Sequence, residues 1–261
     1  MTRILAVAGA GSSNIKSTTA ANLAAALATL GVGVELCDLD PAGHSTRALT
    51  GAAPPVASPA GSVRRVTLDD GHPVAAPARL QLAEPESDRA DLATKPLPAV
   101  LIVECAPRLD ARSVDVLHGA DLVLVPVDAS PLARRAIDEV AAHLLPMPVA
   151  PREGGALATH GDSPRAPAAP RLRAVLSRLL PRATDRWALV DAIEERHPGA
   201  LYGVTVPMGR RTTSASGTPA LAPATLYSPA GRAAAAYRAL AGLVARDLGL
   251  SIAERRPEPA R

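Results

Sequence analysis

Residues 4–22 read ILAVAGAGSSNIKSTTAAN, and this stretch decides the fold. Residues 4–8 predict a buried strand, residues 9–15 a glycine- and serine-rich loop, and the Ala/Leu-rich run 20–30 predicts a helix that Gly31 closes. A strand–loop–helix unit places backbone N–H groups, a lysine ammonium and hydroxyls around one point. The stretch therefore predicts a site for a di- or triphosphate with Mg²⁺.

The P-loop spacing is not kept in this stretch. It requires glycine immediately before the lysine and another glycine five residues earlier, where this chain has Ile15 and Ala10. The lysine is nevertheless informative, because only two of the 28 Lys and Arg residues, Lys16 and Lys95, are lysines. An ammonium is compact and fits between phosphates where a planar guanidinium fits poorly. We therefore predict that Lys16 binds phosphate; the alternative is a solvated lysine at a helix start.

Composition indicates one globular domain. The chain has 261 residues, of which 48% are hydrophobic and 20% charged, so we expect one α/β domain over residues 1–250 and a flexible tail over 251–261. The net charge of +3 permits contact with phosphate backbones but does not require it. No stretch reaches the roughly 18 apolar residues of a membrane span, and Cys37 and Cys105 each end an apolar run. We expect a cytoplasmic protein with reduced cysteines and no membrane partner.

Two carboxylates follow the second predicted strand, residues 33–37. Asp38 and Asp40 alternate there, within the segment DLDPAGHST at 38–46. Ligands of open α/β sheets bind at the carboxyl ends of strands, so both carboxylates are expected beside the phosphate site, where they can hold a hydrated Mg²⁺ or orient an attacking water. The alternative is an Asx-turn with a helix N-cap.

These segments together resemble the ParA/MinD (Soj-like) family of deviant Walker A ATPases. The resemblance rests on KSTTAANLA at 16–24 and DLDPAGHST at 38–46, and extends to VLIVECAP at 100–107, ADLVLVPV at 120–127 and LYSPAGRAAAAY at 226–237. It implies a short partition ParA type. The expected fold is α/β, a doubly wound, mostly parallel sheet flanked by helices as in P-loop NTPases.

Further elements are expected along the chain. We predict an amphipathic helix over 131–144, a strand over 172–177, a helix over 185–196 and a strand over 201–206. Ser228 and Pro229 predict the N-cap and first residue of a last helix ending near Gly249. Residues 51–61 and 146–170 are rich in proline, glycine and alanine and are interpreted as linkers, and residues 63–82 could supply a strand or two.

The resemblance assigns roles to individual residues. It implies ATP and Mg²⁺ as ligands, with Ser17 on the metal, Thr18 beside the α-phosphate, and Asp38 and Glu104 as carboxylates near the metal. Asp40 is expected to position the attacking water, with Lys16 at the phosphates. The nucleotide-binding residues are then Gly11, Ser12, Ser13, Asn14, Ile15, Lys16, Ser17 and Thr18.

The chain departs from the family at catalytic positions. The lysine that reaches across the family's dimer aligns with Gly11, the glycine pair with Ser12 and Ser13, the glycine before the P-loop lysine with Ile15, and the Walker B aspartate with Glu104. A β-branched residue where glycine takes a positive φ would cost about 1–3 kcal/mol. Asn14 tolerates the left-handed region and could take over the turn. We expect weakened nucleotide binding and impaired hydrolysis.

A DNA contact is expected at Arg210 and Arg211, in the loop after the strand 201–206. The resemblance places a family arginine of nonspecific DNA contact on Arg211. Guanidinium groups pair with phosphates without reading sequence. The alternative is a solvated loop in an arginine-rich protein.

Three functions remain in competition. The first is a partition ATPase: nucleotide controls its homodimerisation, the dimer binds nonspecific double-stranded DNA on the nucleoid, and a ParB-like partner stimulates hydrolysis, all as the resemblance implies. The second is a pseudo-ATPase that acts as a scaffold or DNA-binding relative. The third, a metabolic P-loop enzyme, is weakest because no nucleophile with an ordered base is apparent. We favour a partition protein of uncertain ATPase activity.

Overall fold

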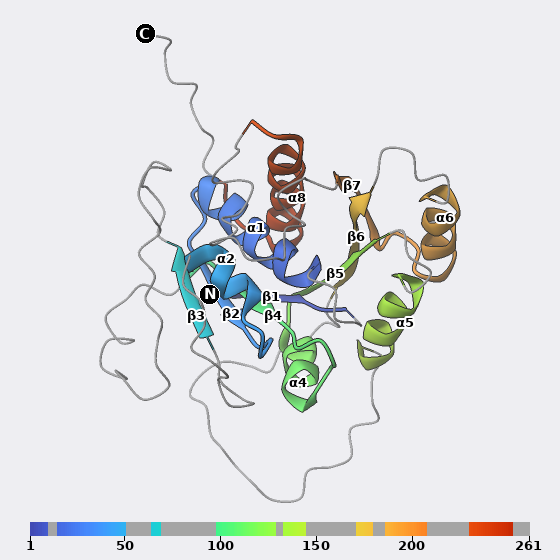
Figure 1. The fold of residues 1–261 in the computed structure, drawn as a ribbon, viewed down its shortest axis with the longest axis horizontal. Helices are drawn as coiled ribbons and strands as arrows, with labels where there is room; N and C mark the ends of the chain where they lie inside the picture. Colours follow the sequence, from blue (N-terminus) through green and yellow to red (C-terminus); the bar gives the residue numbers. More distant parts are fainter. Residues whose placement is uncertain are drawn as a thin grey trace, which may run out of the picture.

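The computed structural model describes residues 1–9, 15–50, 64–68, 98–128, 133–144, 171–179, 186–207 and 230–252. Within them, seven strands form one sheet in the order β3-β2-β4-β1-β5-β6-β7 (Figure 1). The strands are β1 (Arg3–Val7), β2 (Val34–Asp38), β3 (Arg64–Leu68), β4 (Val100–Glu104), β5 (Leu122–Val127), β6 (Arg171–Leu179) and β7 (Leu201–Pro207). The helices are α1 (Ile15–Thr29), α2 (His44–Thr50), α4 (Ala111–Gly119), α5 (Ala133–Leu144), α6 (Arg186–Arg196) and α8 (Arg232–Leu248).

The sheet is parallel except at one edge. β2, β4, β1, β5, β6 and β7 pair in parallel, and β3 pairs antiparallel with β2. The central strands are continuous apolar runs, as expected where helices cover both faces. The predicted α/β, doubly wound, mostly parallel sheet of the P-loop NTPase type is confirmed.

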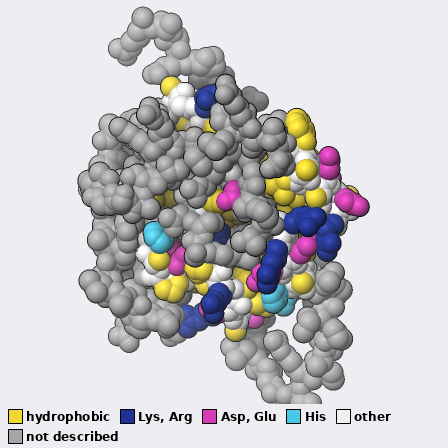
Figure 2. Space-filling view, turned by 45° about the vertical axis from the view of Figure 1, so that its right-hand side comes forward, with side chains coloured by type: hydrophobic (Ala, Val, Ile, Leu, Met, Phe, Trp, Pro, Cys, Tyr) yellow, Lys and Arg dark blue, Asp and Glu magenta, His cyan; other side chains and the backbone are white. Residues whose placement is uncertain are grey.

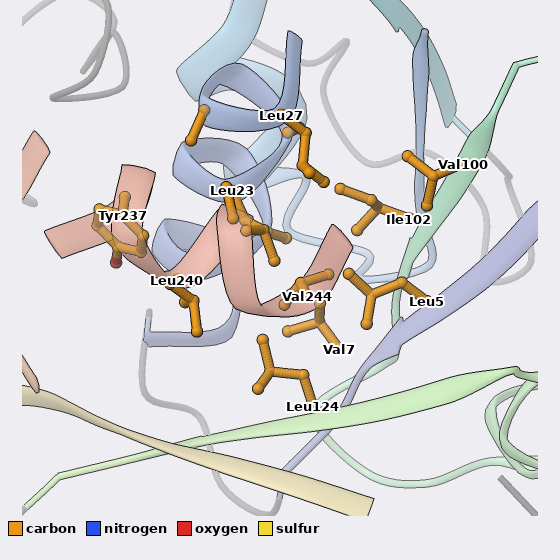
Figure 3. Packing of buried hydrophobic residues seen from close by; sticks show 14 of the residues in the cluster. Leu5, Val7, Leu23, Leu27, Val100, Ile102, Leu124, Tyr237, Leu240 and Val244 are labelled. Atoms are coloured by element: carbon orange, nitrogen blue, oxygen red, sulfur yellow. The ribbon is translucent and has the colours of Figure 1, made fainter. Parts of the chain in front are cut away.

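Helices cover the two faces of the sheet and define two cores (Figure 1). On one face, α1, α2 and α8 pack over alternate residues of the central strands, and Figure 3 shows Val244 of this core beside Leu5 and Val7 of β1. On the other face, α4, α5 and α6 pack over the remaining residues. The alternation of strand side chains between the cores follows from the period of two in a strand.

Helix α1 is buried on nearly every side. Twelve of its 15 residues are buried, five of them alanines, because α1 contacts the sheet, α2 and α8 together. Small side chains allow such close approach, and alanine has the highest helix propensity. This close packing therefore holds the N-terminus of α1 in a fixed position at the carboxyl ends of the strands.

Several boundaries differ from the predictions. Helix α8 begins at Arg232 with Gly231 as N-cap, so the prediction that Pro229 is the first helical residue is wrong. Its end is confirmed, because Gly249 has a φ of 65° and caps the helix. The sequence analysis missed α2 and α4, which are only seven and nine residues long. Most of the predicted linkers 51–61 and 146–170 and the tail 251–261 lies outside the described residues.

Among the described residues, none of the helices has the length and apolar character needed to cross a membrane. Cys37 and Cys105 are both buried, and neither forms a disulfide bond within the part of the chain that the structure describes.

Candidate functional site

The carboxyl ends of three neighbouring strands lie together in the sheet. Glu104, the last residue of β4, is the register partner of both Val7 at the end of β1 and Asp38 at the end of β2. The backbone continues this alignment past the strands, because the Cys105 N–H donates to Val7 O over 3.0 Å and the Leu39 N–H donates to Glu104 O over 3.0 Å. The register thus brings the predicted carboxylates to the start of the loop that precedes α1.

Lys16 lies in the first turn of α1 and is only 4% exposed. Its aliphatic stem runs back over Gly9: a Cβ at Gly9 would lie 3.9 Å from Lys16 Cδ. Burial lowers the pKa of the ammonium, and the nearby carboxylates of Glu104 and Asp40 partly offset this effect. The alternative of a solvated lysine is therefore wrong, and Lys16 is held among acidic groups at the sheet edge.

Ser17 joins α1 to β4. Its hydroxyl donates to Glu104 Oε1 over 2.5 Å, and both residues are buried. Burial, together with the charge of Asp38, raises the pKa of Glu104 to about 8, although the nearby hydroxyls of Ser17 and Ser45 act in the opposite direction. A carboxyl with such a pKa holds its proton at neutral pH until a cation replaces it.

The aspartate pair forms the Asx-turns of the alternative interpretation, and its role at a metal or an attacking water stays a prediction. Asp38 Oδ1 accepts from the Asp40 N–H over 3.0 Å and Asp40 Oδ1 accepts from the Ala42 N–H over 2.9 Å, which are the i to i+2 bonds of Asx-turns. Both side chains are also buried, and Asp38 lies beside Glu104 in the sheet. The turns therefore fix the carboxylates at the site instead of excluding them from it.

The sequence analysis missed two supporting residues. The Thr46 hydroxyl donates to Asp38 Oδ2 over 2.7 Å and its N–H donates to the same oxygen over 3.2 Å. Ser45 is fully buried and acts on Glu104 as described above. The available signal was the position of two hydroxyl residues at the start of α2, directly after the aspartate pair.

The donor set fits magnesium with phosphate. No group of three His, Cys, Asp or Glu side chains within the described ranges is arranged to hold a metal ion by itself. Mg²⁺ usually binds through one or two carboxylates or hydroxyls, several waters and the phosphates of its ligand. The Ser17 hydroxyl and the Glu104 carboxyl match that requirement, and Glu104 Oε2 is a buried oxygen with no hydrogen-bond partner among the described residues.

Other predicted site residues are placed less fully. Gly11, Ser12, Ser13 and Asn14 lie outside the described residues, as do Arg210 and Arg211. Thr18 follows Ser17 in the first turn of α1 and is half-buried. Ile15 is the first residue of α1 and its side chain is buried, so the steric misfit predicted for a left-handed backbone at this position is wrong. The helix accepts Ile15 because its backbone is helical there.

The described surface over α4, α5 and α6 carries charges of both signs. Figure 2 shows arginine side chains there with carboxylates between them. Asp138 of α5, for example, pairs with Arg196 over 3.2 Å and with His197 over 2.8 Å. This face therefore presents no basic surface of one sign for nucleic acid.

The comparison with protein families agrees with this geometry. A family model described as the CobQ/CobB/MinD/ParA nucleotide binding domain matches residues 5–192, which include α1 and the ends of β1, β2 and β4. The chain belongs to this family. No curated relative matches the sequence.

Solved structures of similar fold cover nearly the whole chain. Cyanothece McdA in complex with ATP is 17% identical, with a TM-score of 0.61, and the match covers 97% of this chain and 99% of that chain. Cobyrinic acid a,c-diamide synthase from Mycobacterium smegmatis, with bound ADP and magnesium, is 22% identical, with a TM-score of 0.53 and coverage of 98% and 100%. pNOB8 ParA bound to nonspecific DNA is 15% identical, with a TM-score of 0.54 and coverage of 95% and 99%. At these identities the likeness shows the family's fold.

Proposed function

We propose that the chain binds ATP with Mg²⁺ between the start of α1 and the ends of β2 and β4, and that it is a ParA-like partition protein. The observation that carries the binding proposal is the buried contact of Ser17 with Glu104, next to the buried ammonium of Lys16. A lysine, a hydroxyl and a carboxyl buried together at a helix N-terminus form a site for a metal-bound phosphate. Among the structures of similar fold, Cyanothece McdA was solved in complex with ATP, and the Mycobacterium smegmatis cobyrinic acid a,c-diamide synthase with ADP and magnesium.

Each residue has a proposed part in this site. Lys16 binds the phosphates, the loop 11–15 and Thr18 surround them, and Ser17 holds the ion with Asp38 and Glu104 nearby. When bound, the ion neutralises phosphate charge. Asp40 is the residue proposed to orient the attacking water, since it lies within reach of the Lys16 ammonium and its turn is fixed by the bond to Ala42.

Hydrolysis is proposed to be slow. Position 11 is glycine, which has no side chain to reach a nucleotide across a dimer. A preorganised positive charge at the transferring phosphate accelerates the reaction by several orders of magnitude. Its loss therefore lowers the rate of hydrolysis more than the affinity for nucleotide. The pseudo-ATPase scaffold is the second candidate, and the glycine at position 11 favours it.

The partition role adds partners to this proposal. Nucleotide would control homodimerisation, Arg210 and Arg211 would contact nonspecific double-stranded DNA, and a ParB-like protein would stimulate turnover. The support is the family membership and the likeness in fold to pNOB8 ParA, which was solved on nonspecific DNA. The proposed location is the cytoplasm, at the nucleoid.

Calorimetric titration with ATP and Mg²⁺ tests the binding proposal. We expect wild-type protein to bind and Lys16→Ala to lose binding, because it removes the buried ammonium. Lys95→Ala is the matched control, since it removes the chain's second lysine and the same charge. Equal affinity of Lys16→Ala and wild type would refute the site, and wild-type protein without affinity for ATP would favour the scaffold.

A further inference from the structure

Two buried oxygen atoms beside the proposed metal site have no hydrogen-bond partner among the described residues. They are Oε2 of Glu104 and Oγ of Ser45, and both residues are 0% exposed. Native proteins satisfy most buried polar atoms, with protein groups, water or a ligand, because an unpaired one is costly. Two such atoms in one site point to a polar partner that the described residues do not supply.

The structure brings these two atoms to the same space. Thr46, which follows Ser45, donates twice to Asp38, and Asp38 is the register partner of Glu104. The Ser45 hydroxyl is near enough to act on the pKa of the Glu104 carboxyl, although no hydrogen bond joins Ser45 Oγ to Glu104 Oε2. The second oxygen, Oε1, is already taken by Ser17. Ser45 and Glu104 therefore leave two neighbouring oxygen atoms with no hydrogen-bond partner among the described residues, beside the ion's proposed position.

We propose that Ser45 is a positioning residue for the metal: Ser45 Oγ and Glu104 Oε2 each accept one hydrogen from a single water molecule bound to Mg²⁺. This inference rests on the proposed binding of ATP with Mg²⁺. Mg²⁺ keeps several of its waters when it binds to proteins, and a metal-bound water has two hydrogens to donate. Two neighbouring acceptors without other partners match that need.

A second residue that fixes the metal-bound water is useful at this position because Glu104 replaces the family's aspartate. The extra methylene gives the Glu104 carboxyl more freedom than an aspartate has, and a group that orients a ligand from the second shell commonly changes metal affinity by about 10–100-fold. Ser45 would restrict that freedom through the shared water. Its effect should appear only when the ion is present.

The test compares ATP affinity with Mg²⁺ and with EDTA by calorimetry, and uses the ratio of the two as the readout. In Ser45→Ala we expect the ratio to fall at least about tenfold, with little change in the affinity measured in EDTA. The melting temperature of the ligand-free variant should not fall, because the change removes an unpaired hydroxyl. A residue that only supported the fold would give the opposite pattern, a lower melting temperature and an unchanged ratio.

Ser177→Ala is the matched control. Ser177 is 1% exposed on β6 and its hydroxyl also lacks a partner among the described residues, so the same chemistry is removed elsewhere in the sheet. Its ratio should equal that of wild type. Ser45→Cys, with a side chain of similar size and a weak acceptor, replaces Ser45→Ala if the latter does not fold, and its ratio should also fall.

The outcomes separate the two proposals. Magnesium-dependent binding of ATP that is equal in wild type and Ser45→Ala overturns the role of Ser45 and leaves the proposed function standing. An equal loss in Ser177→Ala also overturns it, because the effect would not be specific to this hydroxyl. Wild-type protein that binds no ATP in either condition overturns the proposed binding function and this inference with it.

Discussion

The raised pKa of Glu104 predicts that the ligand-free protein loses stability as the pH rises. Folding raises the pKa of this carboxyl from 4.5 to about 8, so between these values the folded state holds a proton that the unfolded state has lost. Unfolding then releases a proton, and a higher pH favours it. The contribution of Glu104 to stability is full below pH 4.5 and is lost as the pH passes through about 8.

The size of this effect follows from the shift. A change from 4.5 to about 8 corresponds to about 5 kcal/mol as an upper bound, at 1.36 kcal/mol for each pH unit. Relaxation of the site and entry of water reduce the measured value, so we expect wild-type protein to lose about 2–5 kcal/mol of unfolding free energy over this range. Glu104→Gln cannot ionise and keeps an oxygen to accept from Ser17, so its stability should change much less with pH.

The measurement is urea unfolding at a series of pH values from 5 to 8, followed by circular dichroism. Fluorescence is less suitable because Trp187, the lone tryptophan, is 63% exposed and reports poorly on the core. The difference between wild type and variant at each pH cancels groups that do not interact with Glu104. Asp115→Asn, at an exposed carboxylate of α4, is the control and should follow wild type. Parallel profiles for wild type and Glu104→Gln would refute the reasoning.

Three further predictions concern turnover, DNA and the fold. Gly11→Lys should raise the steady-state rate of ATP hydrolysis if the missing lysine alone limits it, and a wild-type rate equal to that of ordinary partition ATPases would contradict the impairment. Replacing Arg210 and Arg211 by Ala should reduce the salt slope of DNA binding by up to about two units in filter-binding titrations; an unchanged slope would place the DNA face elsewhere. Asp247→Ala should cost about 1–3 kcal/mol in urea unfolding, because Asp247 Oδ2 accepts from Arg173 and from the Tyr202 hydroxyl, each over 2.8 Å, and full stability would contradict this.

The sequence predicted the parts of the fold that depend on local pattern. The continuous apolar run 122–127 and the Ala/Leu-rich stretch after Lys16 are recognised from their composition and length, and the structure has them as β5 and α1. Short elements carry too few residues for a period to emerge. Helix α2 has seven residues, and its place depends on the tertiary bonds from Thr46 to Asp38, which no local pattern contains.

The sequence predicted which residues belong to the candidate site, but not their burial or their hydrogen bonds. The motif order placed Lys16, Ser17 and the carboxylates at one sheet edge. Their burial, the direct contact of Ser17 with Glu104 and the unpaired Ser45 depend on how the strands align, which is a long-range property of the sheet. Ile15 shows the reverse case: a rule for glycine positions predicted strain, and the start of the helix at that residue removes it.

The burial of α1 bears on how the protein can respond to a ligand. Alanines on this helix touch the sheet, α2 and α8, so a displacement of Lys16 along the helix axis would require those neighbours to move as well. The segment from Asp38 to Thr46, in contrast, is tied to the site by hydrogen bonds that a nucleotide can exchange for its own. Binding of a ligand at the site would therefore move β2 and α2, while α1 would stay in place.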